Sequence, residues 1–376
     1  PQVGLGADFS RQRYSANGLF PKPIAGNTWS NDTLQVTLGW TPDLWGERAA
    51  ALAAAVGQAR AAQADAAMAS QLLATQILRT SIGLARLLAH SDASHRLIEL
   101  RQTAQTLVRQ RHEAGLDTRI DQAQSETSLA ELQTQHQSLL EQVALVRHQL
   151  AVLCGLPPAS LDSYAPQLQD FALQTLPTEL GADLLGRRPD VVAARWRAQA
   201  AHQDVQVART QFYPSVSLGA FAGYNALGLE HLLETGSHQY GVMPAVRLPL
   251  FEGGRLKAQL SGREAERDAA VAQYNQAVLD AVREAADAIR SSEGATQQVA
   301  AQARALQGAT QAFQLAQQRE QAGLGNRLGV LNAQASLIGQ QRAALDLQAR
   351  QLDVQIQLIK ALGGGWSAEP RTTASR

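Results

Sequence analysis

Hydrophobic and polar residues alternate near the start of the chain. Apolar side chains occupy every second position from Val3 through Leu5 to Phe9, with small or polar residues between them. The alternation returns from Leu34 to Trp40, after a loop rich in glycine, proline and asparagine at about 14–32. A period of two places the apolar side chains on one face of a strand. The pattern therefore predicts a β-hairpin with one apolar and one polar face.

The same alternation occurs again in the second half of the chain, around a loop at about 225–239. It predicts a second hairpin with the same division into an apolar and a polar face. The predicted apolar positions of the four strands are Val3, Leu5, Phe9, Leu34, Val36, Leu38, Trp40, Val216, Leu218, Val246 and Leu248.

Between and after the hairpins the periodicity is helical. Nearly uninterrupted helical patterns cover 46–112 and 254–321, and each predicts a helix of roughly 100 Å at 1.5 Å per residue. A shorter helical pattern follows each one, at 119–153 and 326–362. Another helix is predicted at 191–212. Helices of such length are typical of coiled coils, spacers or the staves of a tube rather than of a compact domain.

The second long helix carries two adjacent apolar stripes. One contains Ala281, Ala285 and Ala288, and the other contains Leu279 and Val282. A single seam is typical of a simple coiled coil. Two seams predict contacts with neighbours on both sides, as in a barrel of helices. A wide apolar face in an ordinary bundle is the alternative.

The turn between each long and short helix occurs twice. Ala114-Gly115-Leu116 aligns with Ala322-Gly323-Leu324, and Arg119 aligns with Arg327. A glycine after the last helical turn is the usual helix stop, because it adopts the left-handed conformation without a Cβ clash. The sequence therefore predicts an α+β fold made of a duplicated strand–strand–long helix–short helix unit.

The duplication divides the chain into segments. The helix before the second hairpin has no counterpart before residue 1, so we expect the sequence to begin partway through the first unit. The predicted segments are a first hairpin at 1–45, a first helical hairpin at 46–156, a proline-rich connector at 157–190, a single helix at 191–213, a second β-hairpin at 214–253, a second helical hairpin at 254–364 and a flexible tail at 365–376.

The amino-acid composition does not favour another class of function. The chain has 33 basic and 33 acidic residues, so no net charge favours nucleic acid. Cys154 is the only cysteine and the 8 histidines are scattered, which argues against a metal or catalytic cluster. No apolar run approaches the roughly 20 residues of a membrane-spanning helix. We therefore expect no enzyme activity and no cofactor.

The strands, rather than a helix, are the segments that could cross a membrane. Each is about ten residues long with one apolar face, which fits a tilted strand crossing a bilayer. Four strands cannot close into a barrel, and an open edge in lipid would leave backbone groups without hydrogen-bond partners. The chain is therefore predicted to associate, with two copies supplying eight strands or three supplying twelve. A soluble sheet packed on helices is the alternative.

Four motifs carry a resemblance to a known family. They are Leu185-Gly-Arg-Arg-Pro-Asp-Val191, Phe212-Tyr-Pro-Ser-Val216, Leu248-Pro-Leu-Phe-Glu-Gly-Gly-Arg255 and Val330-Leu-Asn-Ala-Gln334. With the order of elements, they resemble the TolC-like outer-membrane factors, in particular the OprM/NodT branch. The resemblance implies a homotrimer in the outer membrane of a Gram-negative bacterium. It also implies a 12-stranded transmembrane β-barrel continuous with a 12-helix periplasmic α-barrel, the connector forming an equatorial belt.

The resemblance also implies a function. Such proteins are exit ducts of tripartite efflux pumps, conducting drugs and toxic solutes from an inner-membrane pump, of RND or ABC type, through a periplasmic adaptor. Members of this branch are commonly lipoproteins, and their lipid-bearing (palmitoylated) cysteine would lie upstream of residue 1. A duct for type I protein secretion, or a soluble periplasmic scaffold or adaptor without a pore, remains an alternative.

The resemblance assigns roles to the two helical turns. In the family the periplasmic tips close the tunnel until an adaptor opens them, so residues of the turns become candidates for gating and docking. Asn332 replaces the family's common aspartate, so any cation preference would rest on the first turn. For Asp117, a helix N-cap is an equally good interpretation. The predicted gate residues are Asp117, Arg119, Asp121, Arg327, Leu328 and Asn332, and the predicted docking residues are Gly115, Leu116, Gly323 and Leu324.

Overall fold

The structure, a computed structural model, describes residues 1–172, 186–364 and 366. It divides into two compact units. The first comprises 1–60 and 196–272, and the second comprises 61–195 and 273–376. Two long helices, α1 (Glu47–Glu113) and α4 (Arg255–Gln321), begin in the first unit and continue into the second.

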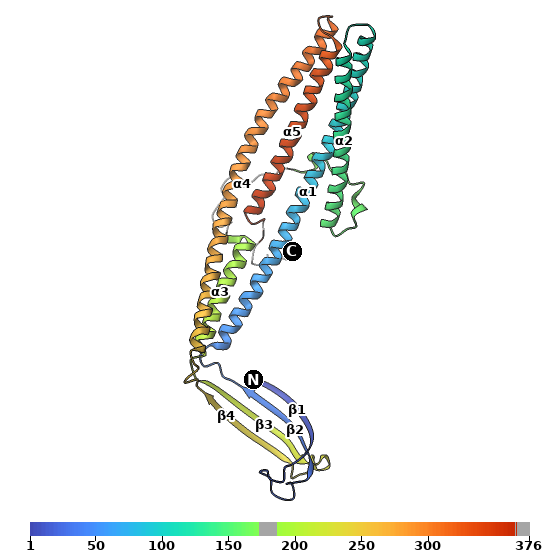
Figure 1. The fold of residues 1–376 in the computed structure, drawn as a ribbon. Helices are drawn as coiled ribbons and strands as arrows, with labels where there is room; N and C mark the ends of the chain where they lie inside the picture. Colours follow the sequence, from blue (N-terminus) through green and yellow to red (C-terminus); the bar gives the residue numbers. More distant parts are fainter. Residues whose placement is uncertain (173–185, 365, 367–376) are drawn as a thin grey trace, which may run out of the picture. The chain divides into compact units, whose positions relative to one another are not determined.

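The first unit contains one antiparallel sheet (Figure 1). Its strands lie in the order β1 (Gln2–Arg13), β2 (Thr28–Trp40), β3 (Ser215–Leu227) and β4 (His238–Arg247). The two predicted hairpins are confirmed, and β2 pairs with β3 to join them. The first loop is shorter than predicted, because β2 already begins at Thr28. Within the described residues, β1 and β4 form the two edges of the sheet.

The register places most apolar residues of the four strands on one face. Val3 lies opposite Leu38, and Leu38 lies opposite Ala220. Ala220 in turn lies opposite Val242. Residues directly opposite in neighbouring strands share a face of the sheet. The predicted apolar positions on this face are Val3, Leu5, Phe9, Leu34, Val36, Leu38, Trp40, Val216, Leu218 and Val246.

Leu248 is the exception, and its assignment to a strand was wrong. The strand β4 ends at Arg247, so Leu248 belongs to the segment that leads into α4. The next residue is Pro249, which cannot donate a backbone hydrogen bond to a neighbouring strand. The alternation of apolar residues therefore continues beyond the point at which strand pairing stops.

The opposite face of the sheet is largely polar, although Trp29, Phe221 and Met243 also lie on it. The side-chain amide of Asn225 donates to Thr33 Oγ1 at 2.7 Å. The amide of Gln239 donates to Gln35 Oε1 at 3.2 Å. These side-chain bonds link β2 with β3 and β2 with β4 across the same face. The sheet thus has the two-sided character that its alternation predicts.

Segments of three α-helices and the short 3₁₀ helix η4 (Leu229–His231) complete the first unit. The segment of α3 (Pro189–Thr210) that belongs to this unit lies between α1 and α4. A Cβ added to Gly57 would lie only 3.1 Å from Ala200 Cβ, so α1 and α3 approach closely. On the other side, Arg209 of α3 lies 3.3 Å from Glu264 of α4.

The second unit is a layer of helices in the order α2–α1–α5–α4 (Figure 1). The short helices are α2 (Arg119–Leu153) and α5 (Arg327–Ala361), as the sequence predicts. Apolar side chains fill each contact. The pairs of helices meet through Leu84 with Val143 and Leu150, through Ala85 with Ala349 and Leu352, and through Ala285 and Ala288 with Leu358 and Ala361.

The described part of the connector includes short 3₁₀ helices that belong to the second unit. They are η1 (Pro158–Leu161) and η2 (Leu168–Asp170), and Leu168 packs into the contact between α1 and α5. Part of the predicted connector, 173–185, and the tail at 367–376 lie outside the described residues.

Only one of the two apolar stripes of α4 is buried. Ala281, Ala285 and Ala288 are at most 8% exposed. In the other stripe, Leu279 is 65% and Val282 is 48% exposed. One seam therefore packs within the chain, and the other is open to a neighbour.

One hydropathy result differs from the sequence analysis. An 18-residue window of α1 reaches a mean hydropathy of 1.2, which by length and composition alone would suffice for a membrane span. Alanine supplies much of the apolar character of this helix. Because α1 packs against α2 and α5 through Leu84 and Ala85, the hydropathy is also accounted for by helix contacts.

Candidate functional site

The first helical turn is closed by backbone hydrogen bonds. The amide of Gly115 donates to the carbonyl of His112 at 2.9 Å, and that of Leu116 donates to Arg111 at 2.8 Å. Gly115 has a φ of 72°, in the left-handed region. This combination is a Schellman motif, which satisfies the last carbonyls of a helix.

The second turn repeats this geometry. Gly323 has a φ of 71°, and its amide donates to Glu320 at 2.9 Å. The amide of Leu324 donates to Arg319 at 2.8 Å. Both turns lie at the same end of the second unit (Figure 1). Leu116 and Leu324 are 69% and 71% exposed, so the four predicted docking residues form two matching, exposed turns.

The side chains of the two turns differ. In the first turn, Arg111 donates to both carboxylate oxygens of Asp117, at 2.9 and 2.8 Å. The Asp117 side chain is only 13% exposed, and the hydrogen bond from Arg111 lowers the pKa of its carboxyl group. Asp117 is therefore an ion-pair partner, and the N-cap interpretation was wrong because Thr118 occupies that position.

Asp121 is held by the cap of α2. Its carboxylate accepts from the backbone amide of Thr118 at 2.8 Å, and its own amide donates to Thr118 Oγ1 at 3.3 Å. This reciprocal pair is a capping box. Hydrogen bonds from Thr118 lower the pKa of Asp121, so the carboxyl group stays charged at neutral pH. Arg119, next to it, is exposed.

The second turn has no acidic counterparts. Gly325 and Gly329 stand where the first turn has Asp117 and Asp121, and Asn326 caps α5 by accepting from the Gly329 amide at 2.8 Å. Arg327 lies 3.4 Å from Glu320. Across 321–341 the sequence contains no aspartate or glutamate.

The remaining predicted gate residues contact α1. Leu328 packs beside Leu100 and Leu331, in the contact between α1 and α5. The side-chain oxygen of Asn332 accepts from Arg101 Nη1 at 3.4 Å. Leu328 and Asn332 thus contact α1, whereas Asp117 and Asp121 form hydrogen bonds within the first turn. The sequence did not indicate the partners Arg101 and Arg111.

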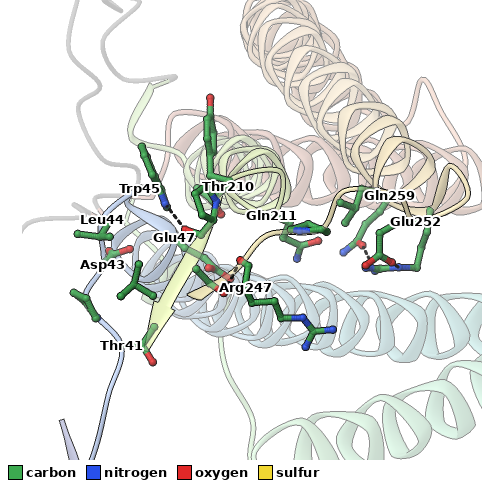
Figure 2. Close-up of a pocket in the computed structure, with 18 residues that line it drawn as sticks. Thr41, Asp43, Leu44, Trp45, Glu47, Thr210, Gln211, Arg247, Glu252 and Gln259 are labelled. Atoms are coloured by element: carbon green, nitrogen blue, oxygen red, sulfur yellow. Dashed lines mark hydrogen bonds and ion pairs between the residues drawn. The ribbon is translucent and has the colours of Figure 1, made fainter. Parts of the chain in front are cut away.

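A cavity of about 390 Å³ occupies the junction of strands and helices in the first unit (Figure 2). Residues of both copies of the strand-to-helix motif line it. Trp45 Nε1 donates to the Pro214 carbonyl at 2.7 Å, and its ring stacks on Tyr213 at 4.9 Å. Sequence reasoning missed this site, although the similar segments Thr41–Arg48 and Leu248–Arg255, which both lead from a strand into a long helix, were a signal for it.

Charged groups of this junction bond with residues at the starts of α1 and α4. The carboxylate of Asp43 accepts from the amides of Arg48 and Ala49, at 3.2 and 2.9 Å. The Ala49 hydrogen bond is the main cause of a lowered pKa for Asp43. Arg255 lies 2.9 Å from Glu252. Among the described residues no three histidine, cysteine, aspartate or glutamate side chains gather to hold a metal.

Comparisons with known proteins agree with this architecture. Residues 1–156 and 180–364 match the model of the family described as outer membrane efflux protein. Multidrug resistance outer membrane protein MdtP of Shigella flexneri is 31% identical over 98% of this chain and 77% of its own length. Fusaric acid resistance protein FusA of Burkholderia cepacia is 34% identical over 70% of this chain. That match spans about half, 51%, of FusA.

A solved structure supports the same conclusion. The outer membrane protein VceC from Vibrio cholerae is 35% identical, with a TM-score of 0.86 over 98% of this chain and 87% of that chain. The chain therefore shares the fold of an outer membrane protein. The chain belongs to the outer membrane efflux protein family, which is a channel family rather than an enzyme family.

Proposed function

We propose that this chain is one of three identical protomers of an efflux duct. Each would contribute four strands to a 12-stranded barrel in the outer membrane and its helices to a periplasmic tunnel. The observation that carries this proposal is the sheet, most of whose apolar residues share one face and whose edge strands β1 and β4 have no further partner among the described residues. Pairing β4 of one protomer with β1 of the next would satisfy both edges.

Exposed apolar residues on the helices also support a trimer. Leu279 and Val282 form the open stripe of α4. On α2, at the opposite side of the helical layer, Leu145 is 58% exposed. A neighbouring protomer would cover these side chains, since α2 and α4 are the outer helices of the layer in the second unit.

The matching helical turns would form the periplasmic end of the duct. There the two exposed turns of each protomer would meet a periplasmic adaptor, and side chains of the turns would gate the passage. The pump behind the adaptor would be of the RND or ABC type. The cargo would be small toxic molecules, as the names of MdtP and FusA indicate for those relatives.

Disulfide trapping of the sheet edges tests the trimer. In a Cys154→Ser background, Leu5→Cys on β1 would be combined with Val242→Cys on β4, and oxidised in outer membranes. Tyr240→Cys and Val246→Cys would be tried as well, so that three registers of β1 against β4 are covered. We expect at least one pair to give a covalent trimer, with no species larger than three chains on a denaturing gel.

The control moves the first cysteine to the central strand β2. Leu38→Cys with Val242→Cys should give no covalent oligomer, because both sides of β2 are already paired. Covalent species that stop at two chains, or that extend beyond three, would contradict the trimer. A protein that is extracted as a monomer without detergent would support the soluble scaffold instead.

A further inference from the structure

The face of β1 that carries the apolar residues ends in two arginines. Arg11 lies opposite Ser30 of β2, and Arg13 lies opposite Thr28. Because side chains alternate between the faces of a strand, both arginines share a face with Phe9. They follow directly after the apolar stretch, at the end of β1 that leads into the loop and away from the helices.

Aromatic residues mark the edges of the apolar stretch. At the loop end it contains Phe9 and Tyr224, and at the helix end it contains Trp40. Aromatic girdles of this kind lie at the two interfaces of membrane barrels. By register the apolar face extends from Val216, four residues beyond the level of Val3, to Phe9, which is about 34 Å along the strands at 3.4 Å per residue. At a tilt of about 40° this corresponds to a height of about 26 Å, close to a typical lipid-facing band. The arginines therefore fall at the depth of the lipid headgroups.

Both guanidinium groups are exposed and uncompensated. Among the described residues neither Arg11 nor Arg13 has an ion-pair partner, and their neighbours on β2 are the neutral Ser30 and Thr28. The carboxylate on this face of β2 is Asp32, which is only 3% exposed and so is absent from the surface that the arginines share. This boundary of the face is thus positively charged.

We propose that Arg11 and Arg13 bind the phosphate groups of the phosphorylated glycolipid in the outer leaflet of the outer membrane. The inference rests on the proposed function, which places the apolar face in lipid and the loops outside the cell. A guanidinium group matches phosphate oxygens with two parallel hydrogen bonds. Two such groups two residues apart would hold the lipid to β1, close to the edge at which protomers would meet.

Lipid binding to the purified protein in detergent tests this proposal. Native mass spectrometry would compare bisphosphorylated lipid A with its dephosphorylated form. We expect Arg11→Gln and Arg13→Gln each to weaken binding of the phosphorylated lipid about fivefold, and the double variant about 25-fold. Binding of the dephosphorylated lipid should not change.

Gln12→Glu is the matched control. It changes the net charge by the same amount as Arg11→Gln, but Gln12 pairs with Trp29 on the opposite face of the sheet. We expect it to bind phosphorylated lipid A like the unmodified protein. Equal weakening by Gln12→Glu and Arg11→Gln would overturn the proposal, and so would arginine variants that bind normally.

The disulfide trap keeps this result separate from the proposed function. Arginine variants that still form covalent trimers but bind phosphorylated lipid A normally would overturn only the lipid inference. A protein that forms no trimer and binds neither form of lipid A would overturn the duct itself.

Discussion

Arg188 Nη2 lies 2.9 Å from Oε2 of Glu284, which joins the start of α3 to α4 in the second unit. The same guanidinium group donates to both carboxylate oxygens of Asp190, at 3.1 and 2.7 Å. Its Nη1 donates to the carbonyl of Ala361, in α5, at 3.3 Å. With its side chain only 4% exposed, Arg188 ties together three helices.

Loss of this arginine should destabilise the protein. Arg188→Ala would leave the Ala361 carbonyl and two carboxylates without their donor, at a cost of about 2–4 kcal/mol. Asp190 and Glu284 are about one third exposed and regain some water contact, which keeps the cost below that of a fully buried pair. Thermal unfolding in detergent would measure it. The exposed neighbour Arg187 supplies the control, and equal melting temperatures for Arg187→Ala and Arg188→Ala would contradict the prediction.

The same cluster predicts a pH dependence. Burial alone would raise the pKa of Asp190, but the hydrogen bonds and charge of Arg188 outweigh it and lower the pKa. The folded-state pKa is thus below the unfolded value of about 3.9, so the stabilisation is present above about pH 4 and disappears as pH falls through the folded-state pKa. The difference in melting temperature between the unmodified protein and Asp190→Asn should stay constant from pH 7 to 5. A difference in melting temperature that already vanishes between pH 7 and 5 would show that a titratable group other than Asp190 controls this stabilisation.

The two copies of the helical turn suggest a stabilising substitution. Gly325 stands at the position of Asp117, and a Cβ there would meet atoms of Arg319 and Glu320 at 3.4 Å, which the structure accommodates. Gly325→Asp would place a carboxylate beside Arg319, as Asp117 lies beside Arg111. We expect it to slow amide hydrogen exchange across 319–327, by an amount consistent with about 0.5–1 kcal/mol.

A serine at the same position separates charge from backbone effects. Gly325→Ser adds a Cβ without a charge, so it should lack the part of the protection that disappears in high salt. If the duct opens by loosening this turn, Gly325→Asp should also reduce export. Identical exchange rates for Gly325→Asp and Gly325→Ser would show that Arg319 forms no ion pair.

Much of the fold was predictable because its signals are local. The helix α2 runs from Arg119 to Leu153, as predicted, since Thr118 caps its start and Gly155 follows its end. The alternation of apolar residues correctly assigned one face to each strand. It could not locate the ends of the strands, as Leu248 shows, because strand length depends on the pairing partner rather than on the pattern.

The candidate site was predictable only in its backbone. The glycine turns follow from the alignment of Gly115 with Gly323, since both need a left-handed conformation. The bond between Arg101 and Asn332 joins positions 231 residues apart, and no local pattern encodes that distance. The ion pair of Arg111 with Asp117 spans only six residues, but it depends on the fold of the turn.

The glycine turns offer a test of docking. A Cβ at Gly115 or Gly323 would meet open space, so a substitution there strains only the backbone, by roughly 1–2 kcal/mol and most for a β-branched residue. Gly115→Val and Gly323→Val should abolish export while covalent trimers still form, because the side chain would project into the surface proposed for the adaptor. Asparagine tolerates the left-handed conformation and projects less bulk at Cβ, so Gly115→Asn should retain more export. Normal export by both valine variants would contradict docking at the turns.

The first turn alone should set any ion preference at the tips. Asp121 is exposed, and its lowered pKa keeps it charged above about pH 4, whereas Asp117 is paired with Arg111. Three Asp121 carboxylates in a trimer would form an anionic ring, which favours cations. Asp121→Asn retains an acceptor for the Thr118 amide, so it should lower the cation-to-anion permeability ratio without unwinding α2. Reversal potentials in a salt gradient across planar bilayers would measure this ratio. In the unmodified protein, titration of Asp121 should not change the ratio between pH 5 and 8, because its carboxyl group stays charged over that range. The control is Glu113→Gln, which removes an acidic group from the end of α1 outside the predicted gate. Equal ratios for Asp121→Asn and the unmodified protein would place ion selection elsewhere in the duct.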